Sequence, residues 1–440
     1  MDNVSEICPV PVASACSFPT VAQIHSALPN AEARIATWLL CIEDCALRIE
    51  EYGRDRVTFV TDWRDRYEEG ESATGIVSWQ CRQSVPANHD RQQCLTSQDD
   101  QSAMATMKAV QVSEPGGDLA VVDRDIPVPG PGEVRIHVRA CGICHSDEFV
   151  KEGTYPGIEY PRVPGHEVTG VVDAVGEGVT MWSEGDRVGV GWHGGHDFTC
   201  PACRDGDFVN CNNGKVTGIS FDGGYAEYMC APSEAVAKMP DDLDFDEAAP
   251  LLCAGITTFN ALRNSSLSPG DRVAVQGVGG LGHLGIQYAA KFGCEVIALS
   301  RGTDKEELAR ELGAHHYIDT TDGDPAEKLL ALGGADVLLA TAPSSEAITE
   351  VAGGLARDGV LMVVAATMEP IEISPMQLIA GRKSVQGWPS GSADDSEDTL
   401  NFSALNDVAP MIETFPLTEA KEAYETMINN DARFRVVLVP

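Results

Sequence analysis

Residues 273–282 read Val-Ala-Val-Gln-Gly-Val-Gly-Gly-Leu-Gly, and this stretch is the strongest indication of the fold of the chain. A short apolar run leads directly into the pattern Gly-x-Gly-x-x-Gly, and a helical pattern follows. Gly277 allows a tight turn, Gly279 lets a pyrophosphate approach the backbone, and Gly282 lets a helix pack on a strand. A glycine-rich turn without a ligand is the alternative, but the flanking strand and helix favour dinucleotide binding. The candidate cofactor-binding residues of this turn are Gly277, Gly279, Gly280, Leu281 and Gly282.

Strand-like and helix-like segments alternate after residue 255. Short apolar, β-branched runs predict strands, and longer runs with apolar residues at three- and four-residue spacing predict helices. The predicted strands are 272–278, 295–300, 316–319, 336–341, 360–365 and 384–387, and the predicted helices are 281–292 and 305–312. This alternation predicts a doubly wound parallel sheet, the Rossmann type of α/β fold, over residues 256–401.

A β-rich segment precedes the alternating part. From Met107 onward, short alternating runs such as 133–138 are separated by Pro-Gly turns such as 129–132. The end of the chain, residues 417–440, predicts a helix followed by a strand at 434–439. We therefore expect a second, β-rich domain that comprises residues 107–255 and 402–440.

Residues 1–106 differ from the rest of the chain, because they contain no lysine and show little periodicity. One helix is predicted at residues 30–52, where apolar side chains recur at helical spacing. Met107 begins a strand-like run that needs nothing before it. We expect residues 1–106 to be a poorly ordered extension, or upstream sequence that precedes the true start at Met107.

The composition is typical of a globular protein with a strongly acidic surface. The formal net charge is −36, and a field of this sign repels the phosphates of nucleic acids and of anionic membranes. High salt would screen the self-repulsion, so a halophilic origin is one interpretation and a merely acidic protein is the other. No apolar run approaches the roughly 20 residues of a membrane span. The first residues carry acidic rather than basic side chains, so we expect a cytoplasmic protein.

The chain has 14 cysteines, and close cysteine spacing in a cytoplasmic enzyme indicates metal binding before disulfides. Three motifs after residue 107 contain ligand types: Cys141-Gly-Ile-Cys-His-Ser-Asp147, Gly165-His-Glu167, and Cys253 in Ala-Pro-Leu-Leu-Cys-Ala-Gly. Each residue alone is more often a buried structural Cys or His, and spacing by itself does not unite the motifs. Six earlier cysteines form no ligand pattern: Cys8, Cys16, Cys41, Cys45, Cys81 and Cys94.

Together with the glycine turn, these motifs resemble the zinc-containing alcohol dehydrogenases of the medium-chain dehydrogenase/reductase superfamily. The resemblance runs in order from Met107 to Pro440 and implies a GroES-like fold for the β-rich domain. In that family the second Cys of Cys-Gly-x-Cys-His, the His of Gly-His-Glu and a later Cys bind catalytic zinc, which implies Cys144, His166 and Cys253 here. Two thiolates and an imidazole leave a fourth position open, as catalytic zinc requires.

The resemblance also implies roles for the neighbours of these ligands. Ser146 is the hydroxyl that contacts the substrate oxygen, Asp147 orients the ligand histidine, and Glu167 lies beside the metal as an alternate ligand. His145 and Arg435 contact the cofactor pyrophosphate, with a solvated strand arginine as the alternative for Arg435.

The sequence departs from the family in two places. Phe149 stands where many members carry a His that passes the alcohol proton to water, so the proton must leave through Ser146 and the cofactor ribose or along a water path.

The structural zinc pattern has Asp in place of its first Cys, and a carboxylate oxygen is an acceptable zinc ligand. We expect a second zinc here, with an empty lobe as the alternative. Its ligands are Asp197, Cys200, Cys203 and Cys211, while His193 and His196 are out of register.

The cofactor preference depends on the end of the second Rossmann strand, about 20 residues beyond the glycines. NAD enzymes usually place Asp or Glu there, whereas this strand ends at Ser300 and Arg301 follows. A hydroxyl donates to a phosphate, a guanidinium pairs with it, and Lys305 adds charge one helical turn later. NADP is therefore predicted over NAD, and the alternative is an NAD enzyme in which Asp304 takes the acidic role.

The expected function is hydride transfer between a small alcohol, primary or secondary, or an aldehyde and a nicotinamide cofactor, in a zinc-dependent enzyme. By family habit it is a homo-oligomer, a dimer or a tetramer. A polyol or sugar dehydrogenase of the same fold needs several polar partners near the motifs, and none is obvious. A non-catalytic dinucleotide-binding protein needs no zinc ligands, whereas this chain keeps all three and Ser146. Phe149, Trp192 and Cys253 are expected to shape the substrate pocket.

Overall fold

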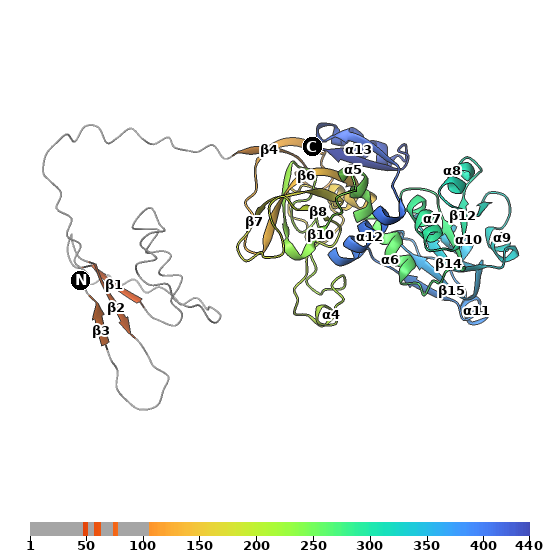
Figure 1. Ribbon diagram of the computed structural model, residues 1–440, viewed down its shortest axis with the longest axis horizontal. Coiled ribbons are helices and arrows are strands. Elements are labelled where there is room, and N and C mark those ends of the chain that lie inside the picture. The colour runs from red at the N-terminus through yellow and green to blue at the C-terminus, as the bar shows by residue number, and fades with distance from the viewer. Residues whose placement is uncertain (1–46, 52–56, 63–73, 78–104) are drawn as a thin grey trace, which may run out of the picture. The chain divides into compact units, whose positions relative to one another are not determined.

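The computed structural model describes residues 47–51, 57–62, 74–77 and 105–440 (Figure 1). The chain forms two compact units, Met1–Asp100 and Gln101–Pro440. The first unit contains a 3-stranded antiparallel sheet. Its strands are β1 (Leu47–Glu51), β2 (Val57–Asp62) and β3 (Thr74–Val77).

Strand β1 shows that the helix predicted at residues 30–52 is wrong over 47–51. These residues pair antiparallel with β2, so another strand, rather than an i→i−4 ladder, satisfies their backbone groups. Helical periodicity in a single segment carries no information about such a partner. The remainder of the predicted helix, 30–46 and 52, lies outside the described residues, as do the six early cysteines.

A 7-stranded sheet organises the β-rich part of the second unit. Its order is β10-β8-β7-β6-β18-β17, and β9 pairs with β6. The strands are β6 (Glu133–Ile143), β7 (Val168–Val175), β8 (Arg187–Val190), β9 (Tyr228–Pro232), β10 (Val236–Lys238), β17 (Ile412–Pro416) and β18 (Arg435–Val439). Because β18 runs antiparallel to β6 with Val437 opposite Gly142, the C-terminal strand lies beside the first cysteine motif.

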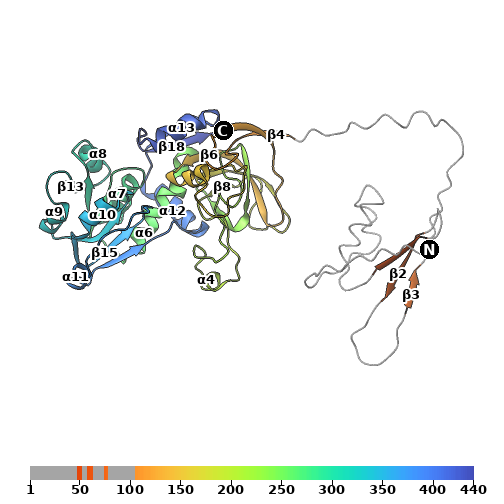
Figure 2. The same cartoon turned by 180° about the vertical axis from the view of Figure 1, so that it is seen from behind.

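Shorter elements surround this sheet. A separate antiparallel pair is formed by β4 (Thr106–Gln111) and β5 (Ala120–Asp125). The helical segments are η1 (His145–Asp147), α3 (Glu148–Glu152), α4 (Pro201–Arg204), η2 (Ser233–Ala235), α5 (Phe245–Ala248), η3 (Ala249–Leu252), η4 (Leu417–Glu419) and α13 (Ala420–Ile428). Figures 1 and 2 show that the lobe around α4 projects away from the sheet.

The predicted doubly wound sheet is confirmed. Six parallel strands follow the order β13-β12-β11-β14-β15-β16, which is the Rossmann order 3-2-1-4-5-6. The strands are β11 (Arg272–Gln276), β12 (Glu295–Ser300), β13 (His316–Asp319), β14 (Ala335–Ala340), β15 (Leu355–Val363) and β16 (Ser384–Gly387). The strand order reverses between β11 and β14, so the carboxyl end of β11, where the glycine turn begins, lies at the switch point.

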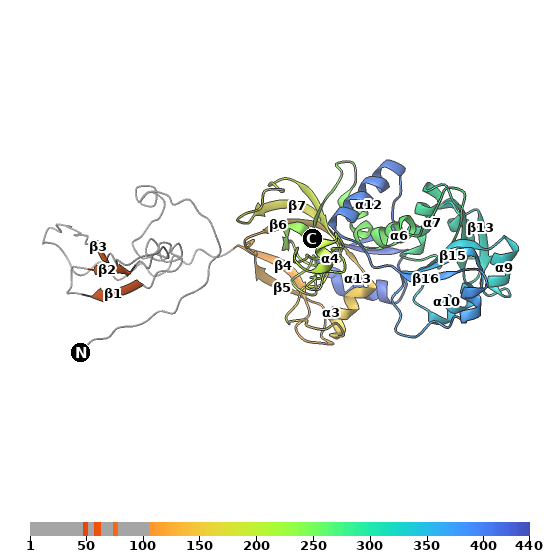
Figure 3. The ribbon, with the colours of Figure 1, turned by 90° about the horizontal axis from the view of Figure 1, so that it is seen from below.

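Helices cover both faces of this sheet, with α6 and α7 on one side and α10 on the other (Figure 3). The alternation of side chains along β11 explains this, since Val273 and Val275 belong to the core with α6 and α7 while Ala274 belongs to the core with α9 and α10. The helices are α6 (Ala254–Arg263), α7 (Gly282–Lys291), α8 (Glu306–Glu311), α9 (Pro325–Ala331), α10 (Ser345–Ala352), α11 (Pro375–Ile379) and α12 (Ala393–Asn406).

The two sheets divide the second unit between them. The 7-stranded sheet takes its strands from residues 133–238 and 412–439, and the parallel sheet takes its strands from 272–387. The domain boundaries at 255/256 and 401/402 stay predictions, because residues 101–440 form one compact unit. Among the described residues, no helix combines the length and the apolar character that a bilayer crossing demands.

Candidate active site

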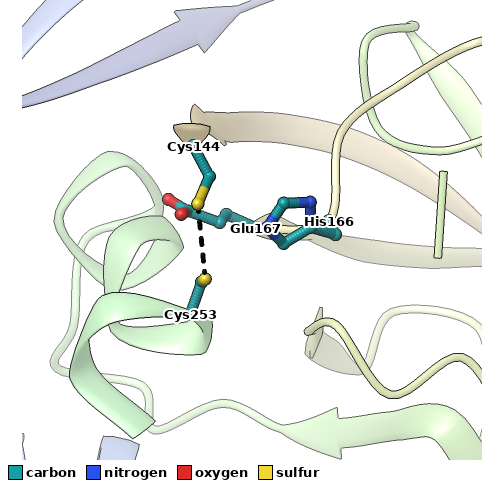
Figure 4. A group of neighbouring side chains, drawn as sticks. All are labelled: Cys144, His166, Glu167 and Cys253. Atoms are coloured by element: carbon teal, nitrogen blue, oxygen red, sulfur yellow. Dashed lines mark hydrogen bonds between the residues drawn. The ribbon is translucent and has the colours of Figure 1, made fainter. Parts of the chain in front are cut away.

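Four side chains that the sequence separates by up to 109 positions converge at one point. The ligand atoms of Cys144, His166, Glu167 and Cys253 all lie within 4.8 Å of one another (Figure 4). Cys144 directly follows β6, His166 and Glu167 precede β7, and Cys253 lies between η3 and α6. The two sulfur atoms are 3.7 Å apart.

Asp147 holds this cluster in place. Its Oδ1 lies 3.1 Å from Nδ1 of His166, and its Oδ2 accepts hydrogen bonds from the backbone N–H of Cys144 at 2.9 Å and from the hydroxyl of Tyr225 at 2.8 Å. The contact with Asp147 assigns the proton of the neutral imidazole to Nδ1, which leaves the lone pair on Nε2. Asp147 therefore orients the histidine in the way that the sequence predicted.

The chemistry of the donors fits a zinc ion. Within the part of the chain that the structure describes, the buried Nε2 of His166 and Oε2 of Glu167 have no hydrogen-bond partner, and such orphaned atoms are rare in folded proteins. The thiol of Cys253 shares its proton with Cys144, which lowers the pKa of Cys144 and raises that of Cys253. Two sulfurs and one imidazole nitrogen form a ligand set of the kind found in catalytic zinc sites.

Arg435 pairs with Glu167 behind this cluster. The guanidinium donates to Oε1 of Glu167 and, at 3.2 Å, to the carbonyl of Ile143. Burial raises the pKa of Glu167 to about 7, and the positive charge of Arg435 opposes that rise. With 3% of its surface exposed, Arg435 is not a solvated strand residue, so that alternative is wrong.

One aromatic ring contacts the cluster, and two more rings pack against that ring. Trp192 meets the imidazole of His166 edge-on with ring centroids 4.9 Å apart, and Phe149 and Tyr155 lie 6.5 and 6.2 Å from Trp192. Each of the three rings is partly exposed, unlike a closed apolar core. Ser146 is also partly exposed and lies one residue before Asp147 in η1.

The glycine turn has the geometry of a dinucleotide-binding turn. Gly277 has φ +98°, a conformation that side chains disfavour. A Cβ at Gly282 would lie 1.8 Å from the carbonyl oxygen of Gly277, so only glycine lets the start of α7 approach β11 this closely. Gly279, Gly280 and Leu281 lie between them. His145, the other predicted pyrophosphate contact, is exposed in η1.

Positively charged groups gather beyond this turn. Lys305 donates from Nζ to the carbonyl of Val278 at 2.8 Å. Burial lowers the pKa of Lys305, and the charges of Arg301 and Arg433 lower it further. Ser300 ends β12, directly before Arg301, and its side chain is partly exposed.

A second cluster forms around α4. The ligand atoms of Asp197, Cys200, Cys203 and Cys211 lie within 4.8 Å of one another. Oδ1 of Asp197 accepts from the backbone N–H of Cys200 at 2.9 Å and of Thr199 at 2.8 Å, and these bonds hold the pKa of Asp197 well below its usual range. His193 and His196 lie outside this group of four.

Three residues that the sequence did not indicate lie near the Cys144–His166–Cys253 cluster or near the cations at the end of β12. Tyr225 and Tyr155 carry no motif, and only the fold brings them to Asp147 and Trp192. Arg433 contributes charge to the Lys305 environment from the end of the chain. Its position two residues before Arg435 was a usable signal, because neighbouring cations at one strand end lie close together.

Comparisons with known proteins agree with this geometry. Two family models match the chain: the alcohol dehydrogenase GroES-like domain over residues 130–241 and the zinc-binding dehydrogenase domain over residues 280–404. The alcohol dehydrogenase patD of Penicillium expansum is 47% identical over 334 residues, which are 76% of this chain and 98% of that protein.

Solved structures give the same result. A cinnamyl alcohol dehydrogenase from Sorghum bicolor has a TM-score of 0.69 at 32% identity, covering 76% of this chain and 98% of that one. The cobalt- and zinc-bound thermostable alcohol dehydrogenase from Pyrobaculum aerophilum has a TM-score of 0.69 at 28% identity, with 76% and 100% covered. The chain therefore belongs to the zinc-containing alcohol dehydrogenases of the medium-chain dehydrogenase/reductase superfamily, and it is an alcohol and aldehyde oxidoreductase that uses a nicotinamide cofactor.

Proposed function

We propose that Cys144, His166 and Cys253 hold a catalytic zinc, with Glu167 as an alternate ligand. The observation that carries this proposal is the convergence of four ligand atoms around a buried, unpartnered Nε2 of His166 among the described residues. When bound, zinc supplies a Lewis acid that polarises the oxygen of an alcohol or aldehyde. Asp147 keeps the imidazole oriented, and Arg435 balances the buried charge of Glu167.

The proton of the alcohol needs a path of its own. Because Phe149 replaces the histidine that many relatives use, Ser146 is proposed to receive the proton, and the ribose of a bound cofactor would supply the next hydroxyl. The partly exposed hydroxyl of Ser146 next to Asp147 supports this role. The rings of Phe149, Tyr155 and Trp192 support a small alcohol with an apolar body and disfavour a polyol, which would need several hydrogen-bond partners.

Metal content and turnover test the catalytic zinc together. We expect Cys144→Ser and His166→Ala to lower kcat/KM by at least about a thousandfold, since the metal supplies several kcal/mol of charge stabilisation and each 1.36 kcal/mol is a factor of ten. Elemental analysis should show one zinc fewer per subunit in each variant. Cys230→Ser is the matched control, because Cys230 lies outside both ligand clusters. Near wild-type turnover in either variant with an intact fold would exclude the assignment.

NADP is the proposed cofactor. The cations Arg301, Lys305 and Arg433 around the end of β12 support it, because a ribose 2′-phosphate pairs with guanidinium and ammonium groups. In a chain of net charge −36, such a concentration of positive charge is a selective site for an anion.

Asp197, Cys200, Cys203 and Cys211 are proposed to bind a second, structural zinc. Four ligand atoms within 4.8 Å support this proposal, and three thiolates with one carboxylate give a closed tetrahedral set.

The edge of the parallel sheet supports the proposed homo-oligomer. All residues of β16 are exposed, and Met376 and Ile379 of α11 are 65% and 69% exposed nearby in the sequence. An exposed edge strand is a template for pairing with a second copy. A molecular mass from light scattering equal to one subunit would exclude this proposal.

We also propose that the protein acts in the cytoplasm of its cell, at high salt.

A further inference from the structure

His283 is a fully buried side chain to which the proposed chemistry assigns no role. It is the second residue of α7, directly after the glycine turn. The backbone N–H of Met411 donates to Nε2 at 3.1 Å, and Nδ1 lies 2.9 Å from the carbonyl oxygen of Gly279. Because a backbone N–H only donates, Nε2 accepts, and Nδ1 carries the proton that it donates to Gly279. Burial lowers the pKa of His283 to about 4, which keeps this neutral form at physiological pH.

Gln287 binds the same distant segment one turn further along α7. Its Nε2 donates to the carbonyl of Ala409 at 3.0 Å, and its Oε1 accepts from the N–H of Ala409 at 3.3 Å. Residues four apart on a helix share one face. This face of α7 therefore binds residues 409–411, which connect α12 to β17.

Met411 passes the connection on to Arg435. The carbonyl oxygen of Met411 accepts hydrogen bonds from the N–H of Phe434 at 3.1 Å and of Arg435 at 3.0 Å. The guanidinium of Arg435 reaches Glu167 in one direction. In the other direction it borders the glycine turn, where a Cβ added to Gly280 would lie 3.1 Å from Nη1 of Arg435.

We propose that His283 is a positioning residue for the nicotinamide cofactor. Through Met411 it keeps Arg435 at a constant distance from the glycine turn, so that the turn, Arg435 and Glu167 present one rigid surface to the cofactor. A site of this kind works only when its groups are held within about half an ångström of the productive geometry. The inference rests on cofactor binding at the glycine turn and is independent of the choice between NADP and NAD.

A double-mutant cycle between His283 and Arg435 tests the inference. The dissociation constant of the preferred reduced cofactor is measured by fluorescence titration of the zinc-loaded enzyme for wild type, His283→Ala, Arg435→Gln and the double variant. We expect His283→Ala to raise the dissociation constant about tenfold in wild type and less than about twofold in the Arg435→Gln background, because contacts in one network are not additive. An equal factor in both backgrounds, or no change in wild type, overturns the proposal.

Two conservative variants separate the two hydrogen bonds of the ring. The Oε1 atom of His283→Gln reaches far enough to accept from Met411, whereas His283→Asn is short and reaches only Gly279. We expect the dissociation constant of His283→Gln to lie within about threefold of wild type, and that of His283→Asn to resemble that of His283→Ala. The reverse order would assign the effect to the local bond to Gly279 and overturn the inference. These variants also keep the test valid if His283→Ala does not fold.

His315→Ala is the control for the loss of a hydrogen bond between a histidine and the backbone. His315 also accepts a hydrogen bond from a backbone N–H, that of Val296 at 3.0 Å, but at β12 rather than at the glycine turn. We expect this variant to lower Tm and to leave the dissociation constant unchanged. If it weakens cofactor binding as much as His283→Ala does, the effect is general destabilisation and the proposal is wrong.

Discussion

Asp147 accepts hydrogen bonds from residues that lie far apart in the chain, and it connects two of the proposed zinc ligands, Cys144 and His166. Its two oxygens bind the N–H of Cys144, the hydroxyl of Tyr225 and the imidazole of His166. Partners of metal ligands matter because they set the tautomer and the orientation of the ring. The motif around Asp147 predicted its contact with His166, whereas the hydroxyl of Tyr225 enters only through the fold.

Tyr225→Phe isolates that hydroxyl. The ring is fully buried and keeps its packing in Phe, so the variant removes one donor to Asp147 and little else. We expect kcat/KM to fall by about tenfold, as for other partners of metal ligands, with a small change in Tm. Steady-state kinetics and thermal unfolding check this. Tyr160→Phe serves as the control, because the hydroxyl of Tyr160 bonds the carbonyl of Val150 away from the metal ligands. Unchanged kinetics in Tyr225→Phe would show that the hydroxyl does not support Asp147.

At the scale of elements, the proposed preference for NADP depends on the end of β12. β12 was predicted at residues 295–300, and the structure ends it at Ser300. Arg301 and Lys305 follow in the same connection, and Arg433 joins them from the segment before β18. Arg433 reaches Lys305 only because the segment before β18 packs beside the end of β12, and the linear sequence does not contain that packing.

The double change Ser300→Asp with Arg301→Ala tests the cofactor preference. It removes a donor and a cation and places a carboxylate where a 2′-phosphate would bind. We expect wild type to prefer NADP and the ratio of kcat/KM for NADP over NAD to fall by on the order of tenfold to a hundredfold, since hydrogen bonds to charged groups contribute about 1.5–3 kcal/mol. Arg357→Ala, which removes an exposed cation on β15, should leave the ratio unchanged. A wild-type preference for NAD would contradict the prediction.

In the lobe around α4, Asp197 stands where the family pattern has a cysteine, and we expect the proposed zinc site to be retained. Asp197 occupies the position of a cysteine and accepts two backbone N–H groups that help to order the turn before α4. We expect Asp197→Ala to lose one zinc per subunit and to lower Tm, while Asp197→Cys keeps the metal. Elemental analysis and thermal unfolding decide this, with Asp207→Ala as the control because the side chain of Asp207 bonds Asn210 in the same lobe and lies outside the four proposed ligands. A zinc content that Asp197→Ala does not change would remove Asp197 from the ligand set.

At the scale of the whole molecule, the catalytic unit is residues 101–440, and among the described residues its cores are built from Met107 onward. Strand β4 contributes the buried side chains of Met107, Ala109 and Val110 to the core of the β-rich part. The relative from Penicillium expansum is matched over 98% of its length by 76% of this chain.

A chain that begins at Met107 tests this directly. It loses Thr106 from β4 and the hydrogen bond from the N–H of Ile126 to the carbonyl of Ala105, both at the end of the strand. We expect unchanged kcat/KM and a Tm close to that of the full chain, because frayed strand ends contribute little. A chain that begins at Ala120 lacks β4 and should be unstable. Loss of soluble expression in the Met107 chain would show that residues 1–106 contribute to the fold.

Residues that interact with their near neighbours were predictable from the sequence. The glycine turn, the βαβ alternation and the strands at 295–300, 316–319 and 384–387 depend on periodicity and turn chemistry within about 20 residues, which contiguous sequence encodes. The proposed metal ligands were predicted for another reason, since each lies in a motif whose order matches a known family, and the structure brings these side chains together. Where only periodicity was used, at residues 47–51, the prediction was wrong because β2 provides a partner.

The tertiary structure alone decided which distant groups meet. Arg435 faces Glu167 across 268 positions, Met411 bonds His283 across 128, and Tyr225 bonds Asp147 across 78. No local pattern encodes such contacts, because they depend on how two sheets and their helices pack once each element has formed. Burial then determines the chemistry of these groups, raising the pKa of Glu167 to about 7 and lowering that of His283 to about 4. Contiguous sequence therefore encodes most of the elements and the ligand types, and the packing of those elements determines which residues support and orient the ligands.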